Sequence, residues 1–231
     1  VVIDPDPNAV ARTEADIFEV VGAKDKEETI RIARKYYVGG IVTSQMENPL
    51  LFMAGIAEKM GYIFPTTESI TKARNKWLMK QSFIQNKIPC AKGILLNKIQ
   101  KLVHSDLDGF TFPLIIKPTD SFSSRGVYKV NNIKEIQQFI NITQNFSSKG
   151  DVIIEEFMEG PEVSVESVTQ NGITEVIQIT DKEITPYPTA VEMAHIQPSN
   201  LEQKIQNAIQ EIVKCAIDAL GLDHCATHAE V

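Results

Sequence analysis

The segment Phe112-Pro-Leu-Ile-Ile-Lys-Pro-Thr-Asp-Ser-Phe-Ser-Ser-Arg-Gly126 joins an apolar strand pattern to a polar loop. The strand would deliver Lys117 at its end, and the loop that follows offers backbone N–H groups and serine hydroxyls. A lysine ammonium is a compact, mobile cation that holds phosphate oxygens, and successive backbone N–H groups bind anions. Ser/Gly loops are also common in surface hairpins, so this segment alone leaves open a phosphate site and an ordinary turn.

A second segment, residues 153–165, places a turn with several carboxylates between two strand patterns. Period-two alternation puts Glu155 and Phe157 on one face of the first strand and Glu156 on the other. A glutamate within an apolar strand is unfavourable unless it is paired or presented to a ligand. We therefore expect a partner or a ligand at Glu155, whereas Glu156 and Glu159 are interpreted as part of a solvated rim.

The last segment, His224 to Val231, also alternates with period two. This places His224, His228 and Glu230 on one face and Cys225 on the other. A zinc site built from these histidines and the cysteine is disfavoured because the alternation puts Cys225 on the opposite face of the strand. The sequence also shows no second cluster of zinc ligands. A lone carboxylate at a strand end better suits Mg²⁺, which takes oxygen ligands and shares them with phosphates.

Strand and helix signals alternate over residues 1–65, which predicts a small, mostly parallel, open sheet. The expected elements are strands at 1–3, 15–21 and 40–43 and helices at 26–37 and 50–60.

Beyond that point, the pattern predicts one long, positively charged helix over residues 67–86, followed by a compact α+β unit. Its expected elements are strands at 91–96, 112–117, 127–130 and 152–157 and a helix at 133–142.

The C-terminal part of the chain is predicted to contain a hairpin, a long helix and a final strand. Asn171-Gly172 is a strong hairpin turn, and residues 181–199 are interpreted as an irregular connection. Ser199 and Glu202 have the spacing of a capping box for the helix that follows. The expected elements are strands at 162–169, 173–180 and 226–231 and a helix that ends at Gly221.

Composition excludes several classes of protein. The 231 residues carry a formal net charge of −7, which disfavours general binding to nucleic acid. No apolar run approaches the ~20 residues that a membrane-spanning helix needs, and the N-terminus lacks a signal-peptide pattern. Three scattered cysteines (Cys90, Cys215, Cys225) predict reduced thiols in a cytoplasmic protein rather than a disulfide framework.

Together, the order and spacing of these segments resemble the ATP-grasp superfamily over essentially the whole chain. Lys76, in Ala73-Arg-Asn-Lys-Trp-Leu-Met-Lys80, is similar to the first ATP lysine of that family, and Lys117 is similar to the second. Residues 119–126 resemble the loop that covers the phosphates. Ser123, Ser124 and Gly126 would line it, with serines where many members carry glycines.

The resemblance also assigns a nucleoside site and a metal ligand. Glu155, Phe157 and Met158 lie in a segment that resembles the strand that reads adenine. The resemblance implies that Glu155 takes the exocyclic amine and that backbone groups around Phe157 and Met158 take the ring nitrogens. Glu162 resembles the ligand of the ribose hydroxyls, and Glu230 resembles the first of two Mg²⁺ carboxylates.

The implied fold is α/β and α+β, with a Rossmann-like parallel sheet followed by two α+β lobes that clamp ATP. Residues 1–65 resemble a pre-ATP-grasp domain without its first strand, and residues 66–231 resemble the ATP-grasp domain, with about 90–157 as its small lid lobe. Family members continue into a Glu-x-Asn strand that supplies further metal ligands, and this segment is not in the sequence. We therefore expect the chain to be incomplete at both ends.

The implied function is that of a ligase that uses ATP and Mg²⁺, with Mn²⁺ as an alternative metal, to join a small carboxylate to an amine. His195 lies in a segment resembling one found in amino-acid ligase-like and carboxylase-like members, where it would touch substrate or phosphate. A satisfied structural histidine is the alternative at that position. Nucleic-acid and membrane partners are not expected, and a homodimer is the candidate assembly.

Three other interpretations compete with that one. The same fold serves bicarbonate activation, as in biotin carboxylases and carbamoyl-phosphate synthases, and it can also form a non-catalytic ATP-binding module. A Rossmann dehydrogenase is rejected because no G-x-G-x-x-G follows a predicted strand.

Overall fold

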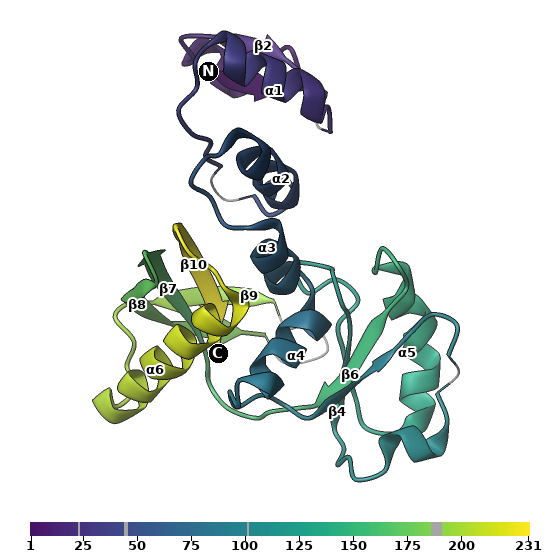
Figure 1. Ribbon diagram of the computed structural model, residues 1–231. Coiled ribbons are helices and arrows are strands. Elements are labelled where there is room, and N and C mark those ends of the chain that lie inside the picture. Colours follow the sequence, from purple (N-terminus) through teal and green to yellow (C-terminus); the bar gives the residue numbers. More distant parts are fainter. Residues whose placement is uncertain (23, 44–45, 101, 186–190) are drawn as a thin grey trace.

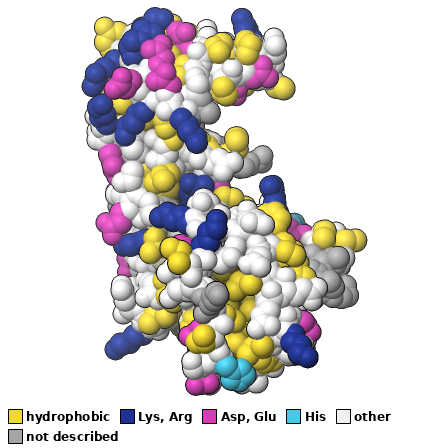
Figure 2. All heavy atoms as spheres, turned by 90° about the vertical axis from the view of Figure 1, so that its right-hand side faces the viewer, with side chains coloured by type: hydrophobic (Ala, Val, Ile, Leu, Met, Phe, Trp, Pro, Cys, Tyr) yellow, Lys and Arg dark blue, Asp and Glu magenta, His cyan; other side chains and the backbone are white. Residues whose placement is uncertain are grey.

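The computed structural model describes every residue except 23, 44–45, 101 and 186–190. A small N-terminal unit is followed by two separate four-stranded sheets, each with its own helix, and α4 lies between those two sheets (Figure 1). Lysine and arginine side chains gather toward the end of the molecule that holds the N-terminal unit, on the face shown in Figure 2. Every helix in the described ranges is too short or too polar to cross a bilayer.

The N-terminal unit contains the predicted parallel pairing in a reduced form. Its two three-residue strands pair in parallel, with Val2 opposite Phe18. The strand predicted at residues 40–43 is wrong: these residues form no strand, and Val42 is 88% exposed, so its side chain gains nothing from burial. The elements are β1 (Val2–Asp4), a 3-10 turn (Val10–Thr13), β2 (Phe18–Val20), α1 (Lys26–Lys35) and α2 (Leu50–Met60).

The single helix predicted over residues 67–86 is also wrong, because the chain breaks at Asn75 into α3 (Thr67–Arg74) and α4 (Lys76–Gln85). Asn75 is extended, with φ −115° and ψ 109°, and its side-chain oxygen accepts hydrogen bonds from two N–H groups in the first turn of α4. The Lys76 N–H donates to the Thr119 carbonyl, 2.8 Å away. The break therefore starts α4 next to the loop that follows β4.

The first four-stranded sheet lies within residues 90–157, the range predicted as the lid lobe, and is called the lid sheet below. Its strands run in the order β3-β6-β4-β5, all pairs are antiparallel, and α5 packs against β4, β5 and β6. Buried side chains from the sheet, α5 and the 3-10 turn before β4 form its core: Leu107, Leu114, Ile116, Val130, Ile136, Val152 and Ile154. The elements are β3 (Gly93–Leu96), a 3-10 turn (His104–Leu107), β4 (Leu114–Pro118), β5 (Tyr128–Val130), α5 (Ile133–Asn145) and β6 (Val152–Glu156).

The second sheet has the strand order β10-β7-β8-β9, again antiparallel throughout. One face packs on α6, whose Ile209, Val213 and Ile217 follow the i, i+4 spacing of one helix face and meet Val163 and Ile179. The opposite face carries the polar side chains of Glu162, Lys182 and Glu230. The elements are β7 (Glu162–Gln170), β8 (Ile173–Ile184), β9 (Glu192–Ile196), α6 (Gln203–Leu220) and β10 (Cys225–Glu230).

Two predictions near this sheet are corrected. Residues 181–199 are not wholly irregular, because β8 continues to Ile184 and β9 forms an edge strand, while residues 186–190 lie outside the described part. The capping box is absent: Glu202 is the N-cap without a side-chain bond, and the Ser199 hydroxyl instead donates to Asp181 on β8. That contact ties the start of α6 to the sheet.

Candidate functional site

A buried ionic cluster joins α4 to the lid sheet. The Glu155 carboxylate on β6 accepts from Lys117 at the end of β4 through one oxygen and from Lys80 on α4, 3.0 Å away, through the other. The Glu155 side chain is 11% exposed and that of Lys80 is 7% exposed. The expectation that Glu155 has a partner is thus confirmed, and it has two.

These two lysines set the charge state of Glu155. Burial alone would raise the pKa of the Glu155 carboxyl, but the positive charges of Lys117 and Lys80 outweigh it and hold the pKa below its ordinary value. The carboxylate is therefore ionised at neutral pH, and the cluster of two ammonium groups and one carboxylate carries a net positive charge.

Lys76 lies in the first turn of α4 beside the loop that follows β4. Its ammonium donates to the Ser121 carbonyl over 2.6 Å and lies 5.8 Å from the centre of the Phe122 ring. Burial lowers the pKa of Lys76, the nearby charge of Lys117 adds to that effect, and the negative charge of Glu230 opposes it. Lys117 on β4 and Glu230 on β10 are therefore both near enough to influence the charge of Lys76.

The loop itself has an unusual backbone. Ser123 and Ser124 are exposed and have φ of 57° and 55°, in the left-handed region that normally favours glycine. Gly126 also has positive φ, and a Cβ there would lie 2.8 Å from the Phe146 ring, so only glycine fits. Turns of this kind can form concavities in which successive backbone N–H groups bind an anion.

The connection after β6 bears on the predicted adenine site. The Phe157 N–H donates to the Pro113 carbonyl, and the Lys129 ammonium lies 3.7 Å from the centre of the Phe157 ring. Met158 is 69% exposed. The Phe157 N–H is therefore already hydrogen-bonded within the protein, whereas Met158 is exposed and accessible to a ligand.

A second ionic cluster lies on the open face of the other sheet, around Lys182 on β8. The Lys182 ammonium contacts carboxylates from three different strands: Glu192 at 2.7 Å, Glu230 at 2.5 Å and Glu162 at 3.9 Å. The Lys182 side chain is only 4% exposed. This brings two residues of the predicted site, Glu162 and Glu230, to one cation.

Sheet register explains that convergence. Lys182 lies directly opposite Glu162 on β7 and His195 on β9, and Glu230 on β10 pairs with the residue two places after Glu162. Burial alone would lower the pKa of Lys182, but hydrogen bonds to Glu192 and Glu230 outweigh it and raise the pKa above its ordinary value. Lys182 therefore stays charged.

The two histidines of interest are exposed and paired to glutamates. His195 Nε2 is 3.6 Å from Glu192, and His228 Nδ1 is 2.6 Å from Glu166. His228 and Glu230 are both exposed on β10 and alternate with more buried neighbours, which confirms the predicted alternation.

The described residues allow a limited test of a metal site. They include no group of three His, Cys, Asp or Glu side chains arranged to hold a metal ion. Glu230 offers a carboxylate, and Mg²⁺ usually binds proteins through one or two carboxylates together with substrate phosphates. Glu230, which pairs with Lys182, would therefore hold Mg²⁺ only together with phosphate oxygens of a bound ligand.

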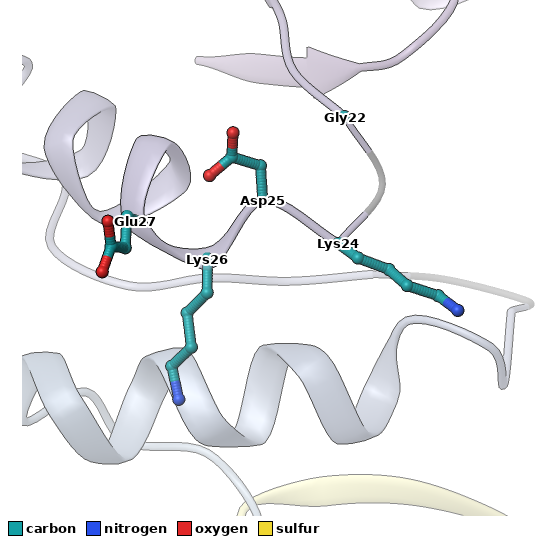
Figure 3. Close-up of a pocket in the computed structure, with 5 residues that line it drawn as sticks. All are labelled: Gly22, Lys24, Asp25, Lys26 and Glu27. Carbon is teal, nitrogen blue, oxygen red and sulfur yellow. The ribbon is translucent and has the colours of Figure 1, made fainter.

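A shallow hollow of about 770 Å³ at the start of α1 is not part of this site. Figure 3 shows that the side chains around it point away from one another, with Lys26 directed toward α2 and Glu27 to the other side. The Asp25 carboxylate caps α1 by accepting from the Glu28 N–H. Among the described residues around this hollow, no set of groups converges on a ligand.

Sequence reasoning missed Lys80 and Lys182, the two central cations of these clusters. Lys80 was only one of several basic residues on a helix, and Lys182 fell in a stretch interpreted as irregular. The signal available for Lys80 was its i, i+4 spacing from Lys76, which places both on one helix face. Lys182 had no comparable local signal.

Comparison with known proteins decides the family. The family model described as the ATP-grasp domain matches residues 110–231. The chain belongs to the ATP-grasp family. The match includes the strand with Lys117, the loop after it, Glu155, the Lys182 cluster and the last strand.

Named relatives of the chain are ligases. The alanine–anticapsin ligase of Bacillus subtilis is 28% identical over 230 residues, covering 89% of this chain and 47% of that protein. A D-alanine–D-alanine ligase of Azobacteroides pseudotrichonymphae is 33% identical over 145 residues, covering 58% of this chain and 44% of that protein. The chain thus spans about half the length of the curated relatives it matches.

Solved structures show the same ATP-grasp fold. An L-amino acid ligase from Bacillus licheniformis superimposes with a TM-score of 0.76 at 23% identity, covering 93% of this chain and 52% of that chain. The ADP complex of an N5-carboxyaminoimidazole ribonucleotide synthetase superimposes with a TM-score of 0.81 at 19% identity, covering 99% of this chain and 58% of that chain. The predicted fold class is confirmed.

Proposed function

We propose that the protein is an ADP-forming ligase that activates a small carboxylate with ATP and joins it to an amine. A carboxylate oxygen attacks the γ-phosphorus, the bond from that phosphorus to the bridging oxygen breaks, and ADP leaves. The amine then attacks the acylphosphate carbonyl, loses a proton and displaces phosphate, which leaves an amide. Such chemistry depends on positioning and charge neutralisation rather than on a protein nucleophile.

The observation that carries this proposal is that Lys76 and Lys117 both lie next to the loop that follows β4, where Lys76 donates to the Thr119 and Ser121 carbonyls. Lys117 comes from the lid sheet, and Lys76 from the helix between the sheets. Both ammonium groups would bind phosphate oxygens, while the backbone around Ser123 and Ser124 and the turn at Gly126 would close over them. Each lysine would exchange its present partner for phosphate.

The remaining residues of the proposed site hold the nucleoside and the metal. The strand end at Glu155, Phe157 and Met158 would meet adenine, and Glu162 would meet the ribose hydroxyls. Glu230 would hold Mg²⁺, with Mn²⁺ as an alternative. When bound, the metal neutralises charge on the phosphates.

The alanine–anticapsin ligase is 28% identical to this chain over an alignment that covers 89% of it. This similarity supports an amino acid as the carboxylate and an amine as the acceptor. His195, on the edge strand beside Glu192, would touch one of these substrates. We also propose the division into a pre-ATP-grasp domain over 1–65 and an ATP-grasp domain over 66–231, with about 90–157 as the lid. A cytoplasmic location and a homodimer are part of the same proposal.

Replacing Lys117 tests the proposal. We expect Lys117→Ala in the full-length protein to reduce ATP turnover at least tenfold, about 1.4 kcal/mol of barrier, because one cation is lost from the phosphates. The measurement is ADP release under Mg-ATP with a carboxylate and an amine present.

The matched control is Lys214→Met, on the exposed side of α6, where Lys214 makes only a surface pair with Glu211. This variant should retain the wild-type rate. Wild-type rates in the Lys117 variant would refute the assignment of that residue and of the phosphate site.

A further inference from the structure

We infer that Lys80 is a positioning residue for phosphate binding: it fixes the Glu155 carboxylate, which in turn aims the Lys117 ammonium at the nucleotide. The Glu155 side chain is then a counter-ion of the phosphate lysine, in addition to its proposed place beside adenine. This inference rests on the proposed function, because it assigns a role within the same nucleotide site.

Lys80 is held at two points. It lies on α4, one turn after Lys76, and is 6% exposed. Its ammonium donates to the Ala91 carbonyl at 2.5 Å, just before β3, and contacts Glu155 at 3.0 Å on β6. An ammonium bound by a main-chain carbonyl and a carboxylate has little freedom, so Lys80 is a fixed support rather than a mobile ligand group.

The backbone of the lid leaves space for this contact at Gly93. A Cβ at Gly93 would lie 3.1 Å from Glu155 Cβ and 3.3 Å from Lys80 Cε, closer than most side-chain contacts. Gly93 stands directly opposite Glu155 in the β3–β6 pairing. The absence of a side chain there lets the Lys80 stem reach the carboxylate between the two strands.

Lys117 and Lys80 differ in side-chain exposure and in the Glu155 oxygen that each one binds, which gives them different roles. The Lys117 side chain is 24% exposed, against 7% for Lys80, so Lys117 is the one that can reach a ligand. Each lysine holds a different oxygen of Glu155. When Lys117 moves to a phosphate, Lys80 still neutralises Glu155, and no buried carboxylate is left unpaired.

Removing Lys80 should therefore act through Lys117. In Lys80→Met, Lys117 is the lysine of the two that still pairs with Glu155. When Lys117 binds phosphate instead, the buried Glu155 carboxylate loses both lysines. We expect the affinity of the full-length protein for ATP to fall about tenfold, whereas the affinity for adenosine, which has no phosphates, stays within twofold. Both are measured by displacement of a fluorescent ATP analogue.

A double-mutant cycle separates positioning from packing. Glu155→Gln removes the negative charge at nearly constant shape, so Lys80→Met should have little further effect on ATP affinity in that background. Lys214→Met is the control, and thermal melting confirms that each variant is folded.

The outcomes are distinguishable. Loss of affinity for ATP but not adenosine, together with non-additive effects in the cycle, supports the inference. Equal loss of affinity for both ligands, additive effects, or wild-type affinity in Lys80→Met overturns it while the proposed function stands. Failure of the wild-type protein to bind ATP overturns both.

Discussion

Two lysines are nearly enclosed at the proposed site, and each is accompanied by carboxylates. Lys80 is 6% exposed next to Glu155, and Lys182 has a 4% exposed side chain next to Glu192 and Glu230. A buried ammonium is unfavourable unless it is paired and hydrogen-bonded. These residues are therefore held in place by charge, which suits a site that must handle a polyanionic ligand.

The thiols give a test of the residue environments on β10. Burial, with a smaller contribution from Asp223, raises the pKa of Cys225 to about 11, whereas Cys215 on α6 is exposed. Because the thiolate is the reactive form, we expect iodoacetamide at pH 8 to label Cys215 at least tenfold faster than Cys225. Peptide mass spectrometry over a time course measures both rates, and comparable labelling of the two would contradict the described packing of β10.

At this scale, the sequence predicted which residue types matter but not their partners. The need for a partner at Glu155 followed from its place in an apolar strand, and that expectation is confirmed. The identity of that partner did not follow, because Lys80 is distant in sequence and reaches Glu155 only across the lid sheet. Lys182 and Glu230 are likewise brought together by strand register, which local patterns do not specify.

Among the elements, α4 contributes two lysines to the proposed site, Lys76 and Lys80, which lie one turn apart. Its starting point is set by Asn75, whose side-chain oxygen accepts from the Trp77 and Leu78 N–H groups at 3.0 Å each. An N-cap of this kind satisfies N–H groups that have no partner within the helix. We therefore expect this capping residue to contribute to the position of Lys76, together with the hydrogen bonds from Lys76 to Thr119 and Ser121.

Asn75→Ala tests that dependence. We expect the free energy of unfolding to fall by about 1 kcal/mol, because alanine cannot accept the two hydrogen bonds. Urea unfolding followed by circular dichroism measures the change. Asn207→Ala, at an exposed position of α6 where Asn207 bonds only the Gln203 side chain, is the control and should shift stability by less than about 0.5 kcal/mol.

An Asn75 variant as stable as the wild type would show that the start of α4 is fixed by tertiary contacts instead. The main-chain bond from Lys76 to Thr119 is the first such contact to consider.

Local patterns predicted most elements well and failed where tertiary contacts decide. The helix over 50–60 and the end of α6 at Gly221 are confirmed, since an apolar pattern and a left-handed glycine cap are local features. The break at Asn75 was missed because the basic, helix-favouring residues on both sides hid a capping residue between them. The strand at 40–43 failed because an apolar run forms a strand only where a neighbour pairs with it.

In the molecule as a whole, the proposed nucleotide site is assembled from parts that are far apart in sequence. α4 contacts α6 of the second lobe, and its lysines face the lid, so this helix stands between the two sheets (Figure 1). Lys117 on the lid and Glu230 on the second sheet then approach the same region from two sides. In the proposed ligase, a ligand that bridges these groups would draw the two sheets together, and such closure excludes water from a reactive acylphosphate.

The most direct test of this account is turnover by the full-length protein. Mg-ATP would be incubated with pools of amino acids and other carboxylates, each with and without an amine, and ADP and phosphate would be measured. We predict that ADP and phosphate form in equal amounts, and only when a carboxylate and an amine are both present. Tight binding of ATP without turnover in any pool would contradict the ligase assignment and would favour a non-catalytic nucleotide-binding role.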